Sequence, residues 1–136
     1  MDEVLLVGRI LFVILFVFSA FGHFQRHRMM VEYTRQAKVP FPELAVPVSG
    51  LMIVAGGLGV LLGVWGDLAA LLLVAFLIPV AFTMHRFWGV DAQTQMMQMP
   101  HFLKNIALAG AALVLFYLFR EAGDDLPYTL TGPLFD

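Results

Sequence analysis

The four histidines of this 136-residue chain are the residues best suited to bind a ligand. His23 and His27 follow the first long apolar stretch, His85 follows the third, and His101 precedes the fourth. Imidazoles on different helices can hold a haem or a metal ion, or hydrogen-bond a quinone carbonyl. Histidines at a water boundary are usually solvated, which counts against a haem or metal. A quinone fits slightly better, because it needs an imidazole donor and aromatic rings around its headgroup. We therefore expect no metal site.

A second candidate is Arg9, which lies about two turns inside the first apolar stretch. A guanidinium at that depth costs several kcal/mol unless it is paired or reaches water. It could contact a ligand such as a quinone headgroup. Alternatively, its role is structural, with Asp67 or the carbonyls of a helix end as its partner. The sequence favours the structural alternative, because an acid is available nearby.

Lys104 and Asn105 are adjacent polar residues near the start of the fourth apolar stretch. They could simply reach the membrane surface and bond across helices, or they could complete a polar pocket with His85 and Arg9. Aromatic rings able to sandwich a headgroup are Phe21, Phe24, Phe82, Phe87 and Trp88. The candidate ligand-binding residues are Arg9, His23, His85, Trp88, Lys104 and Asn105.

Four apolar stretches, which would position these side chains, make up most of the chain. They cover residues 4–24, 44–65, 68–84 and 102–119, and 60% of all residues are hydrophobic. A helix needs about 17–25 mostly apolar residues to cross a bilayer. We predict an all-α membrane protein, a four-transmembrane-helix antiparallel bundle that forms a single domain over residues 1–136. The first stretch should be retained, because it begins with acids and not with a basic signal-peptide region.

The connections between the stretches differ in charge. Six of the eight Lys and Arg residues lie in or beside residues 25–43 and 86–101. The positive-inside rule places these two segments, expected to be loops, in the cytoplasm and both termini outside. Residues after Arg120 are expected to form a polar loop. We expect membrane lipids as partners and no nucleic acid.

Two features indicate how the helices pack. Small residues line one side of the second stretch, where helix backbones can approach closely; they are Ser49, Gly50, Gly56, Gly57, Gly59 and Gly63. Pro79 should kink the third helix and free the carbonyl of Ala75. The chain has no cysteine, which excludes disulfides, thiol relays and iron–sulfur clusters within it.

The chain resembles the DoxX family of small four-helix bacterial membrane proteins, in the order and spacing of several motifs. These are Arg9, Phe18-Ser19-Ala20-Phe21-Gly22-His23, Val39-Pro40-x-Pro42, Gly56-Gly57-x-x-x-x-x-Gly63, His85-x-Phe87-Trp88 and Phe102-x-Lys104-Asn105-x-Ala107-Leu108-x-Gly110. Two departures matter. Ile53 stands where many members carry a glutamate, and the lysine often found at the end of the first helix is replaced by His23 or His27.

The resemblance implies a location in the bacterial inner membrane and, among relatives, membrane subunits of quinone-linked oxidoreductases. It therefore implies a redox-linked subunit, associated with a quinone and acting with partner proteins. The alternative is a non-enzymatic accessory or scaffold subunit of a larger complex or homo-oligomer. A small transporter is less well supported, because apart from Arg9 the middle of the membrane carries almost no charge.

Overall fold

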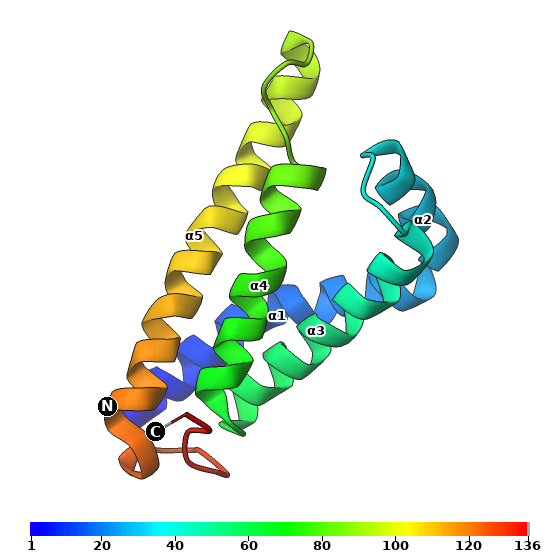
Figure 1. Ribbon diagram of the computed structural model, residues 1–136. Coiled ribbons are helices and arrows are strands. Elements are labelled where there is room, and N and C mark those ends of the chain that lie inside the picture. The colour runs from blue at the N-terminus through cyan, green and yellow to red at the C-terminus, as the bar shows by residue number, and fades with distance from the viewer. Residues whose placement is uncertain (136) are drawn as a thin grey trace.

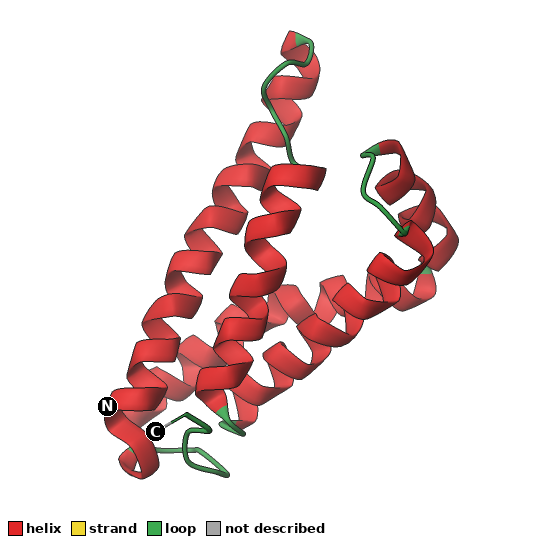
Figure 2. Cartoon of the chain, in the orientation of Figure 1, coloured by secondary structure: helices red, strands yellow, loops and turns green. Residues whose placement is uncertain are grey.

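The computed structural model describes residues 1–135, which form five α-helices and one short 3-10 helix (Figures 1 and 2). The elements are α1 (Asp2–Gln25), α2 (His27–Gln36), α3 (Pro42–Leu62), α4 (Gly66–Met84), α5 (Ala92–Ala122) and η1 (Gly123–Asp125). Four of them, α1, α3, α4 and α5, are long and apolar enough to cross a membrane. The predicted all-α membrane bundle with four spanning helices is confirmed.

Both segments expected to be loops contain helix, so that part of the prediction was wrong. Residues 25–43 include α2, and α5 begins at Ala92 within the segment 86–101. The early start of α5 has a local cause: the Asp91 carboxylate accepts a hydrogen bond from the Thr94 backbone N–H at 3.4 Å and caps the helix. α5 also accommodates Pro100 in its interior.

The helices form two arms that meet at one end and diverge at the other (Figure 1). One arm contains α4 and α5, and the other contains α1 and α3 with α2 at its outer tip. Both termini lie at the end where the arms meet. We call this the closed end and the diverging end the open end.

Glycines of α3 bring the two arms together at the closed end. A Cβ added at Gly56 would lie 2.7 Å from Leu73 Cδ2, and one added at Gly59 would collide with the Ala69 side chain. Both contacts are to α4, so the small-residue side of α3 packs directly on its neighbour. Most of the hydrophobic core lies around this contact and includes Val13, Phe16, Val60, Leu73, Ala112 and Phe119.

The C-terminal tail also belongs to the closed end. Its prediction as a polar loop was incomplete, because helix continues to Ala122 and the tail then folds back against the α3–α4 turn. The backbone N–H of Leu130 donates to the Leu62 carbonyl at 3.2 Å, and that of Thr131 to the Gly63 carbonyl at 3.0 Å. Leu126 is buried in the core. The tail therefore caps the exposed carbonyls at the end of α3.

Candidate functional site

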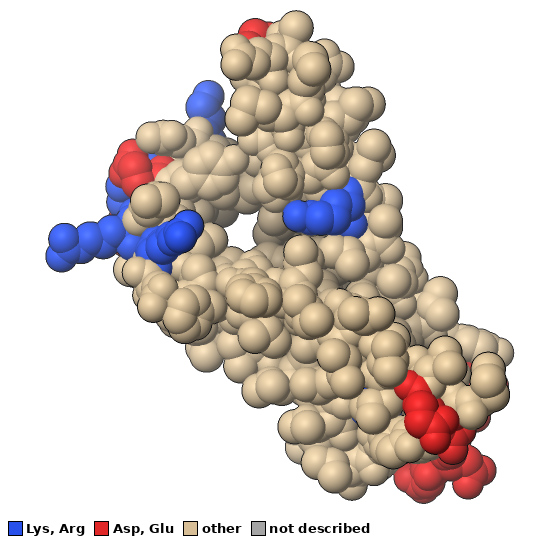
Figure 3. Space-filling model, turned by 180° about the vertical axis from the view of Figure 1, so that it is seen from behind, with Lys and Arg blue, Asp and Glu red and all other residues tan. Residues whose placement is uncertain are grey.

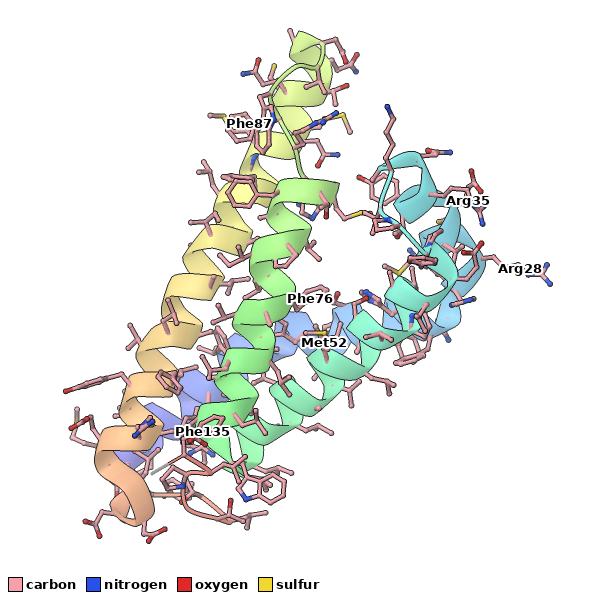
Figure 4. The ribbon with its side chains drawn as sticks, in the orientation of Figure 1. Arg28, Arg35, Met52, Phe76, Phe87 and Phe135 are labelled. Carbon is pink, nitrogen blue, oxygen red and sulfur yellow. The ribbon has the colours of Figure 1, made fainter. Side chains whose placement is uncertain are left out.

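A cavity of about 700 Å³ lies between the two arms toward the open end. Figure 3 shows the molecule hollowed there, with Lys and Arg side chains on both sides of the hollow and several acids at the far end. Met52 of α3 and Phe76 of α4 lie on facing walls (Figure 4). Ala75, whose carbonyl lacks its helix donor because Pro79 has no N–H, lines the cavity too.

Four of the six candidate residues line this cavity. His23 comes from α1, His85 follows the last residue of α4, and Lys104 and Asn105 come from α5. They are far apart in the sequence and are brought together by the divergence of the arms.

His23 has a defined tautomer. Its side chain is only 5% exposed, and its Nδ1 lies 2.8 Å from the Ser19 carbonyl oxygen. A carbonyl can only accept, so Nδ1 carries the proton and donates it. The other ring nitrogen, Nε2, is then a lone-pair acceptor. The His23 ring also meets the Phe76 ring edge-on at 6.1 Å between centroids.

His85 belongs to a chain of hydrogen bonds that crosses the mouth of the cavity. Its Nδ1 lies 3.0 Å from Gln98 Oε1, and Gln98 Nε2 donates to Tyr33 Oη at 3.1 Å. Tyr33 Oη in turn donates to the Met84 carbonyl at 3.4 Å. Tyr33 lies on α2 and Gln98 on α5, so this chain joins the two arms at the open end. We call it the strap.

The surroundings of His85 favour its neutral form. Partial burial lowers the pKa of His85 below the usual 6.5, and positive charge at His101 and Lys104 lowers it further. The hydrogen bond with Gln98 acts in the opposite direction but does not reverse the shift. The His101 ring stacks on that of His85 with centroids 5.1 Å apart.

Among the buried polar side chains of the cavity, Asn105, like Thr34, has no hydrogen bond within residues 1–135. The residue is 5% exposed, yet no fully occluded side-chain nitrogen or oxygen in this part of the chain lacks a partner. Its amide atoms therefore reach the cavity space, where a ligand or water can satisfy them. Lys104 is largely exposed at the same wall.

Arg9 lies away from the cavity, at the closed end. It is 1% exposed and donates to the carbonyls of Val60 at 2.9 Å and Leu61 at 2.5 Å, both near the end of α3. It also donates to the tail carbonyls of Pro127 at 3.1 Å and Tyr128 at 2.7 Å. Of the two structural partners considered for Arg9, the helix-end carbonyls are the ones it binds.

Asp67, the other partner considered for Arg9, binds the tail instead. Its carboxylate accepts the backbone N–H groups of Leu134 at 2.9 Å and Phe135 at 2.8 Å. Both buried charges thus hold the C-terminal tail to the closed end.

The aromatic rings are distributed differently from the expectation. Trp88 packs with Phe82, Phe87 and Phe102 in a cluster outside the cavity. The rings that line the cavity are Phe16, Phe18, Tyr33 and Phe76. Phe21 and Phe24 line a smaller cavity of about 290 Å³ between α1 and α3.

Sequence reasoning missed Tyr33 and Gln98, because both lay in segments read as loops. The available signal was the helical spacing in HRMMVEYTRQ, where Met30, Val31 and Thr34 lie on one side of the amphipathic helix α2. In residues 1–135, no group of three or more His, Cys, Asp or Glu side chains is arranged to hold a metal ion.

Fold and cavity together define an all-helical integral membrane protein with a ligand-sized opening between two helical arms. The chain belongs to the DoxX family, which it matches over residues 4–86. It is 28% identical over 111 residues to the inner membrane protein YphA of Escherichia coli K12, an alignment that covers 82% of this chain and 79% of that protein. No solved structure matches the chain.

Proposed function

We propose that this protein is a redox-linked membrane subunit that binds a quinone in the cavity and acts with partner proteins. The observation that carries this proposal is the buried Asn105 amide, which has no hydrogen bond within residues 1–135 and borders a largely apolar cavity. A volume of about 700 Å³ lies in the usual range for small-molecule sites. An apolar pocket with a few polar groups is also the form that such sites take.

Several residues have distinct roles in this proposal. Phe18 and Phe76 provide apolar contacts to a ring, and His23, His85 and Asn105 hydrogen-bond its oxygens. Lys104 adds positive charge at the mouth. Arg9 donates to four backbone carbonyls, so we propose that it stabilises the fold and does not bind the ligand.

We include a partner protein in the proposal because the chain has no cysteine with which to form a thiol relay or an iron–sulfur cluster. Electrons for a bound quinone would then pass to or from a second protein or a small reductant. We propose the bacterial inner membrane as the location, which is that of the similar protein YphA. The positive-inside rule orients the open end toward the cytoplasm.

A non-enzymatic accessory role is the second candidate, favoured by a separate observation on α5. Ala107, Gly110 and Ala111 are exposed on this helix, and a Cβ added at Gly110 would meet nothing within 4 Å. Such a surface suits close packing by a helix of another subunit. Gentle purification that yields the protein alone would remove the main support for this role.

The test of the proposed function is direct analysis of what the protein carries. The full chain is purified from native membranes in mild detergent, its lipid-soluble ligands are extracted and identified, and binding of a short-chain quinone is titrated. We expect quinone in the extract and saturable binding that weakens in Asn105→Leu and His85→Ala. Absence of quinone together with no titratable binding would contradict the proposal.

A further inference from the structure

We infer that the cavity binds the hydroquinone form of its ligand in preference to the quinone, through hydrogen bonds from the two hydroxyls to Nε2 of His23 and Nε2 of His85. This inference rests on the proposed function and adds which redox form the site selects. It concerns binding alone, so no electron acceptor is required.

The first acceptor is set by the backbone of α1. The Ser19 carbonyl can only accept, and at 2.8 Å it fixes the proton of His23 on Nδ1. In the neutral ring, Nε2 of His23 therefore carries a lone pair. Because His23 lines the cavity and is 5% exposed, that lone pair has little access to bulk water.

The second acceptor is set by the strap. The Met84 carbonyl is an acceptor only, so the Tyr33 hydroxyl donates to it and presents its lone pair to Gln98. Gln98 then donates through Nε2 and accepts through Oε1, which fixes the proton of His85 on Nδ1. Nε2 of His85 is thereby left as an acceptor. In the reverse order the Tyr33 hydroxyl would donate to Gln98, and the Met84 carbonyl would lose its donor.

His85 must also be neutral to accept. The titratable and polar groups around it are His101 and Lys104 on α5, Gln98 on α5, and Tyr33 on α2. His101 and Lys104 disfavour a proton on Nε2, as does burial, and the pKa of His85 is lowered accordingly. Only the Gln98 bond opposes this.

Two acceptors distinguish the two redox forms of a quinone. A hydroquinone has two O–H donors, whereas the oxidised ring has carbonyl oxygens that only accept. In the same position, the carbonyl oxygens of an oxidised ring would face the lone pairs of the two histidines with no proton between them. Such unpaired buried groups lower the binding affinity. The Asn105 amide can donate or accept and so serves either form. Lys104 can only donate, but its side chain is largely exposed and remains hydrated.

The first test compares the two forms directly. The full chain in detergent, without oxygen, is titrated with a short-chain hydroquinone and separately with the corresponding quinone. We expect the hydroquinone to bind at least about tenfold more tightly, the ratio that one lost hydrogen bond of about 1.4 kcal/mol produces. Equal affinities, or tighter binding of the quinone, would overturn this inference while leaving the proposed function intact. If neither form binds, both are overturned.

Variants of Gln98 test the effect of the His85 tautomer separately from direct contact with the ligand, because Gln98 does not itself line the cavity. Gln98→Glu keeps an acceptor for His85 Nδ1 and, in titrations at a pH high enough to keep His85 neutral beside the new carboxylate, should retain the preference for hydroquinone. Gln98→Leu frees Nδ1, so that the proton can move to Nε2, and the preference should fall toward unity. Equal preference in the two variants would overturn the role given to the strap.

A measurement without any ligand completes the test. Nitrogen-15 NMR of the histidine side chains in the full-length protein reports which ring nitrogen carries the proton. We expect Nδ1–H for both His23 and His85 above pH 7, and Nε2–H for His85 in Gln98→Leu. A wild-type protein with Nε2–H at either histidine would overturn the inference, whatever the protein binds.

Discussion

The closed and open ends of this molecule bury polar groups in opposite ways. At the closed end, Arg9 and Asp67 are both at most 1% exposed, and each has several backbone hydrogen bonds. At the open end, Asn105 is 5% exposed and its amide, which borders the cavity, has no hydrogen bond within residues 1–135. A buried charge in a membrane helix therefore does not by itself mark a binding site. A buried group whose hydrogen bonds remain unmade is the better indicator.

The largest effect is expected at Arg9. Arg9→Met removes the donor of four backbone carbonyls, which belong to Val60, Leu61, Pro127 and Tyr128. Each buried acceptor left unpaired costs about 1–3 kcal/mol, so unfolding in detergent should become easier by about 3–5 kcal/mol once water satisfies some of them. Circular dichroism during thermal unfolding measures this. Arg28→Met, on the outward side of α2 (Figure 4), is the matched control and should change little. Equal stability of the two variants would remove the structural role of Arg9.

Asp67→Asn tests the other half of the closed end. An amide oxygen can still accept one of the two N–H groups, from Leu134 or Phe135, but its NH₂ cannot accept the other. We expect a loss of about 1–3 kcal/mol and faster proteolysis of the tail, near Phe135 (Figure 4). Limited proteolysis followed by mass spectrometry detects it. An unchanged tail would show that these two bonds do not hold it.

At the open end, a substitution should reduce ligand affinity and leave stability nearly unchanged. Asn105→Leu removes the unpaired amide and should leave stability within about 1 kcal/mol of the wild type, since no hydrogen bond in residues 1–135 is lost. Ligand affinity should fall about tenfold, the effect of one hydrogen bond. Thermal unfolding and ligand titration on the same sample separate the two quantities. A large loss of stability would make the open end structural as well.

Acidification should also act at the open end. The neutral form of His85 is favoured in the folded protein, because its pKa lies below 6.5. Affinity for the hydroquinone should therefore hold at neutral pH and fall as the pH drops below 6.5, through that lowered pKa. The stability that neutral His85 contributes is lost over the same interval, since the unfolded chain takes up the proton first. In His85→Ala, affinity should be low and the pH dependence reduced.

The smallest effect is expected from the strap. Tyr33→Phe keeps the ring but removes the hydroxyl that links Gln98 to the Met84 carbonyl. We expect a cost of about 0.5–1.5 kcal/mol and a broader distance distribution between spin labels on α2 and α5. Tyr117→Phe, on an exposed position of α5, is the control. Identical distributions in both variants would show that packing alone, and not the strap, fixes the separation of the arms.

Much of this architecture could be predicted from the sequence, because apolar stretches of spanning length and the glycines of α3 are local signals. His23, His85, Lys104 and Asn105 were also identified as candidates, on the strength of their polarity at the ends of apolar stretches. The roles of Tyr33 and Gln98 could not be predicted, since they depend on contact between residues 65 positions apart. The helix-end carbonyls were among the partners considered for Arg9, but its tail partners could not be predicted, because Pro127 and Tyr128 return from the far end of the chain.

The most direct test of the central claim is the rise in unfolding temperature that a short-chain hydroquinone produces in the wild type and in Asn105→Leu. A ligand that binds only the folded state stabilises it. Once the ligand concentration exceeds the dissociation constant, the stabilisation grows with the logarithm of that concentration. We expect a rise that continues with the logarithm of the ligand concentration in the wild type and a much smaller rise in the variant. No rise in the wild type, or equal rises in both proteins, would contradict the assignment of the open end as the ligand site.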